Sequence, residues 1–204
     1  MASVQDVLDY WFGDDVAGGS WQARQEIWFN GGDAVDAEIT ARFGATLAQA
    51  AAGALDDWAA TPRGLLALVI VLDQFSRNIH RGTAAAFAND AKALALVRTA
   101  TAQGFDTDLL PIERQFLYMP LMHAEDVAAQ EECLARLHAL AEEPGPAQEM
   151  AIAAIPFAQQ HLEIIQRFGR FPHRNAALGR TSTPAEKAFM ADGGPSFGQE
   201  PQPA

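Results

Sequence analysis

The sequence predicts an all-α protein. Its 204 residues are rich in Ala and Leu and poor in Val and Thr, a composition that favours helices over sheets. No segment shows the sustained alternation of apolar and polar residues that marks a half-buried strand. Several segments instead open on a capping residue and continue with apolar residues three or four apart. We therefore expect an antiparallel array of helices joined by short loops.

Three helices are predicted in the first third of the chain. Ser3 and Asp6 form a capping-box pattern that opens a helix extending to about residue 12. A short helix is expected over 21–29, and a longer one, capped by Asp33, reaches Gly53. We assign the four tryptophans of this region to the core and to helix packing: Trp11, Trp21, Trp28 and Trp58.

The most apolar helix is predicted to begin at Thr61 and Pro62. Thr is a favoured N-cap, and Pro is tolerated at the first helical position because its missing N–H has no partner there in any case. The helix that follows extends to about residue 79 and is apolar on all sides from Leu65 to Leu72, which is typical of a central, buried helix. Its polar residues begin only at Asp73.

The second half of the chain is also predicted to be helical. The expected helices cover 90–104, 111–123 with a break at Pro120, 125–142, 148–168 with a kink at Pro156, and a short stretch after Thr183. Residues 1–192 are thus predicted to form one helical domain. Residues 193–204 are rich in Gly, Pro and Gln and are expected to be a disordered tail.

Composition excludes several classes of protein. A net charge of −12 argues against nucleic-acid binding, which requires an accumulated positive face. The longest apolar run is too short to span a membrane, and the first residues lack the features of a signal peptide. A single cysteine, Cys133, rules out an internal disulfide and fits a reducing compartment. We expect a soluble cytoplasmic protein with no nucleic-acid or membrane partner.

A first polar block follows the most apolar helix. Asp73, Arg77 and Arg81 are four residues apart, so a continuing helix places them on one face, with Asp73 able to pair with Arg77. Asn78 and His80 lie on neighbouring faces. One interpretation is an ordinary helix end, where basic groups complement the helix dipole. The other is a pocket, because the block emerges directly from the core.

A second block makes an otherwise acidic chain basic between residues 161 and 180. Three arginines, Arg167, Arg170 and Arg174, are three and four residues apart, and Gly169 and Pro172 end the helix between them. Guanidinium groups this close need an anion among them. Internal carboxylates can supply it, as can an external carboxylate or phosphate ligand. The internal candidates are Asp73, Glu113, Glu125 and Asp126. A protein-contact surface is the third alternative.

Histidines supply the candidates for proton transfer. His123 precedes Glu125 and Asp126, and together with His80, His161 and His173 these side chains form a conceivable metal site. No His-Glu-x-x-His motif is present, however, so we predict no metal ligands and interpret the two acids as charges that favour the helix they open. The sequence contains neither a nucleophile elbow nor a phosphate-binding or dinucleotide-binding loop, and it indicates no particular cofactor.

Several of these segments resemble one family. The stretches that carry the resemblance are 7–12, 72–79, 81–83, 86–88, 113–116, 123–126 and 167–175. They are similar to the bacterial domain-of-unknown-function 924 family over essentially the whole chain. The resemblance implies an all-α fold like that of tetratricopeptide (TPR) repeat proteins, but it implies no activity, substrate or cofactor. Ser76 departs from the family pattern where relatives often carry Pro.

The leading hypothesis is one polar cavity that binds a small anionic ligand, a carboxylate or phosphate. Its predicted binding residues are Asp73, Arg77, Asn78, Arg81, Glu113, Arg114, Glu125, Asp126, Arg167, Arg170, Arg174 and Asn175. Any proton transfer is assigned to His123, His161 or His173. The alternatives are a helical-repeat adaptor that binds a peptide or protein, and a metal-dependent hydrolase.

Overall fold

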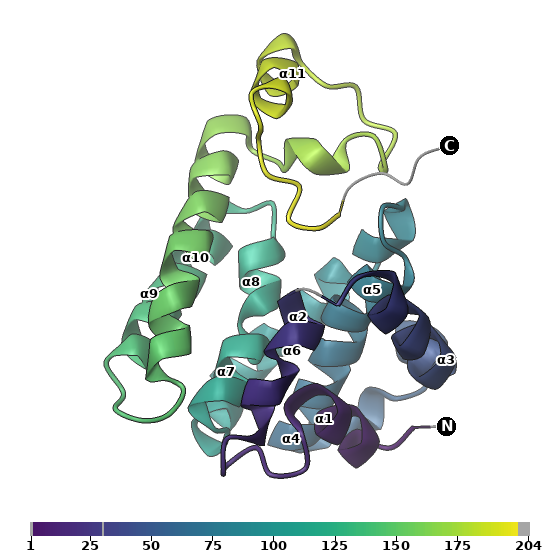
Figure 1. Cartoon of the computed structure of the whole chain (residues 1–204), viewed down its shortest axis with the longest axis vertical. Coiled ribbons are helices and arrows are strands. Elements are labelled where there is room, and N and C mark those ends of the chain that lie inside the picture. Colours follow the sequence, from purple (N-terminus) through teal and green to yellow (C-terminus); the bar gives the residue numbers. More distant parts are fainter. Residues whose placement is uncertain (1, 30, 200–204) are drawn as a thin grey trace.

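The computed structural model describes residues 2–29 and 31–199, and helices and turns account for all of the regular structure in them (Figure 1). This confirms the all-α prediction, while the TPR-like arrangement stays a prediction. α1 (Val4–Phe12) opens on the expected capping box of Ser3 and Asp6. η1 (Ser20–Arg24), α2 (Gln25–Phe29) and α3 (Gly32–Ala51) follow it. None of these helices, or of the others in the described ranges, is long and apolar enough to cross a membrane.

The apolar helix is central, as predicted, but it is not regular. After η2 (Asp56–Ala60), Thr61 caps α4 (Pro62–Val69) by accepting a hydrogen bond from the Gly64 N–H at 3.2 Å. The chain then makes a π-helical segment, η3 (Ile70–Phe75), and continues as α5 (Ser76–Ile79). A π-helical turn inside an α-helix is uncommon and frequently marks a functional site. The residues from Leu65 to Leu72 are fully buried.

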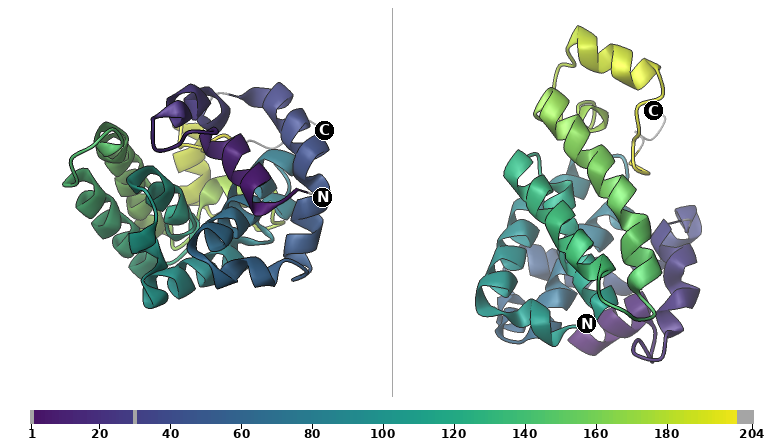
Figure 2. Two further views of the ribbon diagram at one scale, coloured as in Figure 1. Left: turned by 90° about the horizontal axis from the view of Figure 1, so that it is seen from below. Right: turned by 90° about the vertical axis from the view of Figure 1, so that its left-hand side faces the viewer.

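The helices that follow pack against this central one or against one another (Figures 1 and 2). η4 (Ala84–Phe87), α6 (Asp90–Gln103) and η5 (Phe105–Asp108) lead to α7 (Pro111–Leu117) and α8 (Met119–His123). The predicted break falls between these last two helices, at Tyr118. α9 (Val127–Ala141) and α10 (Gln148–Phe168) form a long antiparallel pair, and α10 contains Pro156.

The C-terminal part folds back over the end of this pair. η6 (Pro172–Arg174) and α11 (Pro184–Ala191) form a cap at the top of Figure 1, and Thr183 opens α11 with the predicted capping box. Residues 200–204 of the expected tail lie outside the described residues. In residues 193–199, Phe197 packs its ring on His161 with the ring centroids 3.8 Å apart. This segment, which we call the strap, closes one end of the site described next.

Candidate functional site

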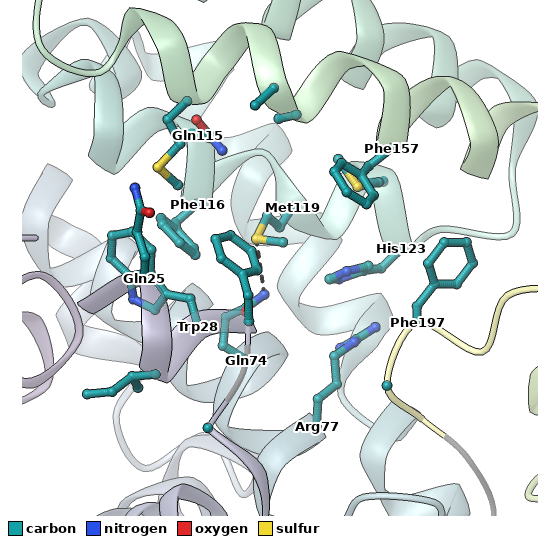
Figure 3. A pocket seen from close by; sticks show the side chains of 18 of the residues that line it. Gln25, Trp28, Gln74, Arg77, Gln115, Phe116, Met119, His123, Phe157 and Phe197 are labelled. Atoms are coloured by element: carbon teal, nitrogen blue, oxygen red, sulfur yellow. Dashed lines mark hydrogen bonds between the residues drawn. The ribbon is translucent and has the colours of Figure 1, made fainter. Parts of the chain in front are cut away.

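A cavity of about 1100 Å³ lies between α2, the α4–α5 helix, α7, α8, α10 and the strap (Figure 3). This volume lies just above the range of about 300–1000 Å³ that is typical of small-molecule binding sites. The walls of the cavity differ from one end to the other. The end nearest α2 and α7 is mainly aromatic and methionine-lined, with Gln25 and Gln115 among these side chains, and the end nearest α5 and the strap is polar.

The apolar arm is built from aromatic and methionine side chains. Trp28, Phe116 and Met119 line it from α2, α7 and α8, and Met150 and Phe157 line it from α10. Phe157 is 61% exposed and Phe29 60% exposed, so two phenylalanines lie in contact with solvent where the cavity opens. The tryptophan assignment is therefore incomplete: Trp21 and Trp28 pack against neighbouring rings as expected, but they also line the cavity.

Asp73 and His123 form the centre of the polar end. Asp73, on the π-helical segment, is fully buried, and its carboxylate lies 2.8 and 3.0 Å from Nδ1 of His123 at the end of α8. It also accepts a hydrogen bond from Gln74 at 2.5 Å. The imidazole lies at the cavity wall with 12% of its side chain accessible, so Nε2 is the ring nitrogen that is available to a ligand.

The protonation of this pair is determined by its surroundings. Burial alone would raise the pKa of Asp73, but Arg77 and His123 outweigh it and hold that pKa at about 2. Burial, with the charge of Arg77, lowers the pKa of His123. At neutral pH the aspartate is therefore ionised and the imidazole neutral. Its one ring proton lies on Nδ1, facing the carboxylate, and Nε2 carries a lone pair.

His161 supplies a second imidazole of the same kind. Its Nδ1 donates to the backbone oxygen of Phe157 at 2.7 Å, and burial lowers its pKa to about 3. Nε2 of this neutral ring is thus also a lone-pair acceptor. The ring centroids of His123 and His161 lie 6.3 Å apart, and the Phe197 ring stacks on the face of His161. The polar end therefore presents two hydrogen-bond acceptors.

The guanidinium groups at this end are already neutralised. Arg77 pairs with Asp73 at 3.0 Å, as the spacing predicted, and holds Asp90 with two hydrogen bonds of 3.0 and 3.1 Å. Arg174 also pairs with Asp90, at 3.2 Å. A third guanidinium group, that of Arg81, makes a two-pronged contact with Asp36. Three guanidinium groups thus face three carboxylates, and the two lining histidines add no charge.

Asn78 and the strap complete the wall. Asn78 donates to the same carboxylate of Asp36 at 2.8 Å. Arg81 donates to the backbone oxygen of Gly198, and Gln199 donates to the backbone oxygen of Arg77. These contacts hold the strap against α5, so that the polar end is shielded from solvent while the apolar end opens to it.

Arg167 and Arg170 of the second basic block lie outside the cavity, although His161 of the same stretch lines it and Arg174 reaches Asp90 at the polar end. This corrects the expectation that the three arginines share one recess. Arg170 makes two hydrogen bonds to Glu186 on α11, at 2.6 and 2.8 Å. Arg167 lies over the rings of Phe168 and Phe189. Glu186 was not among the expected counter-ions, because the sequence does not show that α11 folds back onto this block. Arg167 and Arg170 therefore hold α11 against the end of α10.

Other predicted binding residues also lie away from the cavity lining. Glu125 accepts two hydrogen bonds from Arg180, at 2.7 and 2.9 Å, and one from the Phe171 N–H. Asp126 caps α9 through the Ala129 N–H, in agreement with the helix-start interpretation. The remaining ones make these contacts: Glu113 with Arg63, Arg114 with Glu143, Asn175 with Arg180 and Glu186, and His173 with Phe171 and Phe197.

The predicted residues that line the cavity are therefore Arg77, Asn78, Arg81, His123 and His161, with Asp73 directly behind them. Within the described ranges, no three His, Cys, Asp or Glu side chains cluster as metal ligands. Sequence reasoning missed Gln74, Phe116, Met119, Phe157 and Phe197. Helix periodicity marks such residues only as apolar or polar, and does not distinguish a cavity wall from a core.

The chain matches the model of the family described as "Bacterial protein of unknown function (DUF924)" over residues 7–194. It belongs to this family. A solved structure of a protein of unknown function, ATU0120 from Agrobacterium tumefaciens, is 34% identical and superposes with a TM-score of 0.79. The alignment covers 93% of this chain and 97% of that one. The comparison with curated proteins gave no match. The resemblance inferred from the sequence is thus confirmed, and with it the all-α fold of this DUF924 member.

Proposed function

We propose that this DUF924 protein binds a small amphipathic molecule in the cavity. The apolar arm receives an elongated hydrocarbon or aromatic body, and the polar end receives a head group that hydrogen-bonds to His123 and His161. The observation that supports this most strongly is the division of one cavity into an aromatic, methionine-lined half and a half with two neutral imidazoles. The exposed rings of Phe29 and Phe157 give an apolar body a route inward.

The paired charges at the polar end limit the kind of head group that can bind there. Each guanidinium group at the polar end is paired with a carboxylate, and the acidic residues Asp33 and Glu149 also line the cavity. A fully charged carboxylate or phosphate would therefore lose its hydration without meeting a free cation. Two imidazole lone pairs instead favour a group that donates a hydrogen bond. We accordingly propose an uncharged polar head in place of the anion expected from the sequence.

A matched pair of fluorescent probes tests this. N-phenyl-1-naphthylamine is uncharged, and 8-anilino-1-naphthalenesulfonate has the same aromatic frame with a sulfonate. We expect the uncharged probe to bind at least about tenfold more tightly, a difference of about 1.4 kcal/mol. Equal or tighter binding of the sulfonate would restore the anionic ligand of the sequence-based hypothesis.

A cavity-filling variant locates the binding. Ala154 lines the cavity, so Ala154→Trp fills it and should abolish binding of N-phenyl-1-naphthylamine. Ala139 is exposed on α9 outside the cavity lining, and Ala139→Trp is the matched control that should bind normally. If both variants bind the probe as the parent protein does, the ligand does not occupy this cavity.

A further inference from the structure

We propose that Asp73 and His123 form a general base that activates a water molecule to hydrolyse a carboxylic ester whose acyl chain occupies the apolar arm. The inference rests on the proposed amphipathic ligand site, with an uncharged ester as the head group and a water molecule as the hydrogen-bond donor to the two imidazoles. It adds a reaction, and it adds the chemical class of the substrate.

The geometry of the pair is that of an oriented base. A buried carboxylate that accepts from Nδ1 fixes the imidazole tautomer and ring orientation, and it stabilises the imidazolium that forms when Nε2 takes a proton. Asp73 is in turn held by Gln74 and Arg77, so it cannot swing away. A pair built only to brace two helices has no need to place the second ring nitrogen at a cavity wall.

His161 and Arg77 complete the arrangement. A water molecule between the two rings can donate one hydrogen to Nε2 of His123 and the other to Nε2 of His161. Two hydrogen bonds of about 2.8 Å span roughly 4–5 Å between the two nitrogens, a separation that ring centroids 6.3 Å apart allow when both Nε2 atoms face the water. Its oxygen lone pair is then free to attack. The Arg77 guanidinium points toward His123 in Figure 3, and its Nε and second Nη2 hydrogen are not used by Asp73 or Asp90. These donors suit an oxyanion.

The reaction balances with water as the co-reactant. The water oxygen forms a bond to the carbonyl carbon while His123 Nε2 takes one water proton. The carbonyl electron pair moves onto its oxygen, beside Arg77. Collapse of this tetrahedral intermediate breaks the bond to the alcohol oxygen, which receives the proton from Nε2. The products are a carboxylic acid and an alcohol, and the base is regenerated.

The test uses p-nitrophenyl octanoate and p-nitrophenyl acetate with the full chain. We expect hydrolysis of the octanoate above the buffer rate, a higher kcat/KM for octanoate than for acetate, and loss of activity in Ala154→Trp. His123→Gln should lower kcat/KM by about 10²-fold or more, the contribution of a general base. His138, an exposed histidine on α9, gives the matched control: His138→Gln should retain full activity.

The outcomes are separable. If N-phenyl-1-naphthylamine binds but neither ester is hydrolysed, or His123→Gln hydrolyses as fast as the parent, the general base is overturned and the binding site stands. If the probe does not bind, the proposed function itself fails. Should His123→Gln not fold, the pH profile of the parent decides: kcat/KM must reach a plateau above an inflection that lies below pH 6.5, because burial beside Arg77 lowers the pKa of His123 against the opposing pull of Asp73 and Asp90. A rate proportional to hydroxide at every pH refutes the role.

Discussion

Replacing Asp73 with Asn tests whether the polar end is a network in which each charge depends on the others. Asp73 is completely buried and accepts hydrogen bonds from Gln74, Arg77 and His123. The amide has nearly the same shape, so packing is preserved and only the charge and one set of acceptor sites are lost. Arg77 is then left with Asp90 as its only carboxylate, and Asp90 must also serve Arg174.

The expected cost follows from the burial of these groups. Removing one partner of a buried ion pair destabilises a protein by about 3–5 kcal/mol, because the remaining charge keeps its desolvation penalty without its counter-ion. For a chain of this length each kcal/mol lowers the melting temperature by about 2–4 °C, so Asp73→Asn should lower it by roughly 6–20 °C.

Differential scanning calorimetry at pH 7 measures this change. The control is Asp57→Asn, which removes an exposed carboxylate on η2 and should leave the melting temperature within about 2 °C of the parent. A melting temperature for Asp73→Asn that matches this control would show that the buried charge contributes nothing. The network described for Arg77 and His123 would then be wrong, and with it the tautomer assigned to the imidazole.

Three further predictions concern the scaffold. Gly44 has open space where a Cβ would lie, so Gly44→Ala should stabilise the protein through α3 by about 0.5–1 kcal/mol. A Cβ on Gly64 would lie 2.1 Å from the backbone oxygen of Trp58, so Gly64→Ala should destabilise the protein by about 1–3 kcal/mol. Urea unfolding measures both variants, and equal effects would refute the close approach at Gly64. Burial raises the pKa of Cys133 to about 12, so Ellman's reagent should react with it at least about 10²-fold more slowly in the native protein than in urea. Burial lowers the pKa of His161 to about 3, against 6.5 in the unfolded chain, so the free energy of unfolding falls as the pH drops from 6.5 toward 3, by about 3 kcal/mol at pH 4.5. His161→Phe should remove this part of the acid sensitivity, which urea titrations at pH 7 and pH 4.5 measure. An unchanged pH dependence would contradict the burial of the ring.

Rules for helix capping and for side-chain spacing along a helix correctly predicted the contacts that form within single helices. The caps at Ser3, Thr61 and Thr183 depend only on residues three positions apart, and all three form as expected. The Asp73–Arg77 pair likewise follows from a spacing of four along a helix. In each case the partners are fixed by the backbone geometry of a single element, so a sequence is sufficient to identify them.

Pairing across the chain could not be predicted in this way. His123 lies 50 residues from Asp73, and Arg174 lies 84 residues from Asp90, and nothing in the composition of either segment specifies the other. Three arginines near one another suggested one anion among them. The fold instead gives Arg170 a carboxylate on α11 and Arg174 one on α6, so that these two are neutralised separately, and Arg167 lies over aromatic rings. A sequence does not distinguish arginines that pair with carboxylates of the same chain from arginines that bind an anionic ligand.

The π-helical segment explains why the polar end faces the cavity at all. Each residue of an α-helix turns the chain by about 100°, and a π-helical turn contains an additional residue, so every side chain after η3 is rotated by about that angle relative to a straight α-helix. With regular geometry from α4 onward, the face that carries Arg77 and Asn78 would turn away from the wall that His123 forms, and Asp73 would lose the imidazole. A helix that is apolar on every side gains nothing from an irregular turn in its packing. The π-helical turn therefore lies where the polar residues begin, because the hydrogen bonds of Asp73 offset the energetic cost of the irregular backbone. The backbone of the core helix thus determines the geometry of the site.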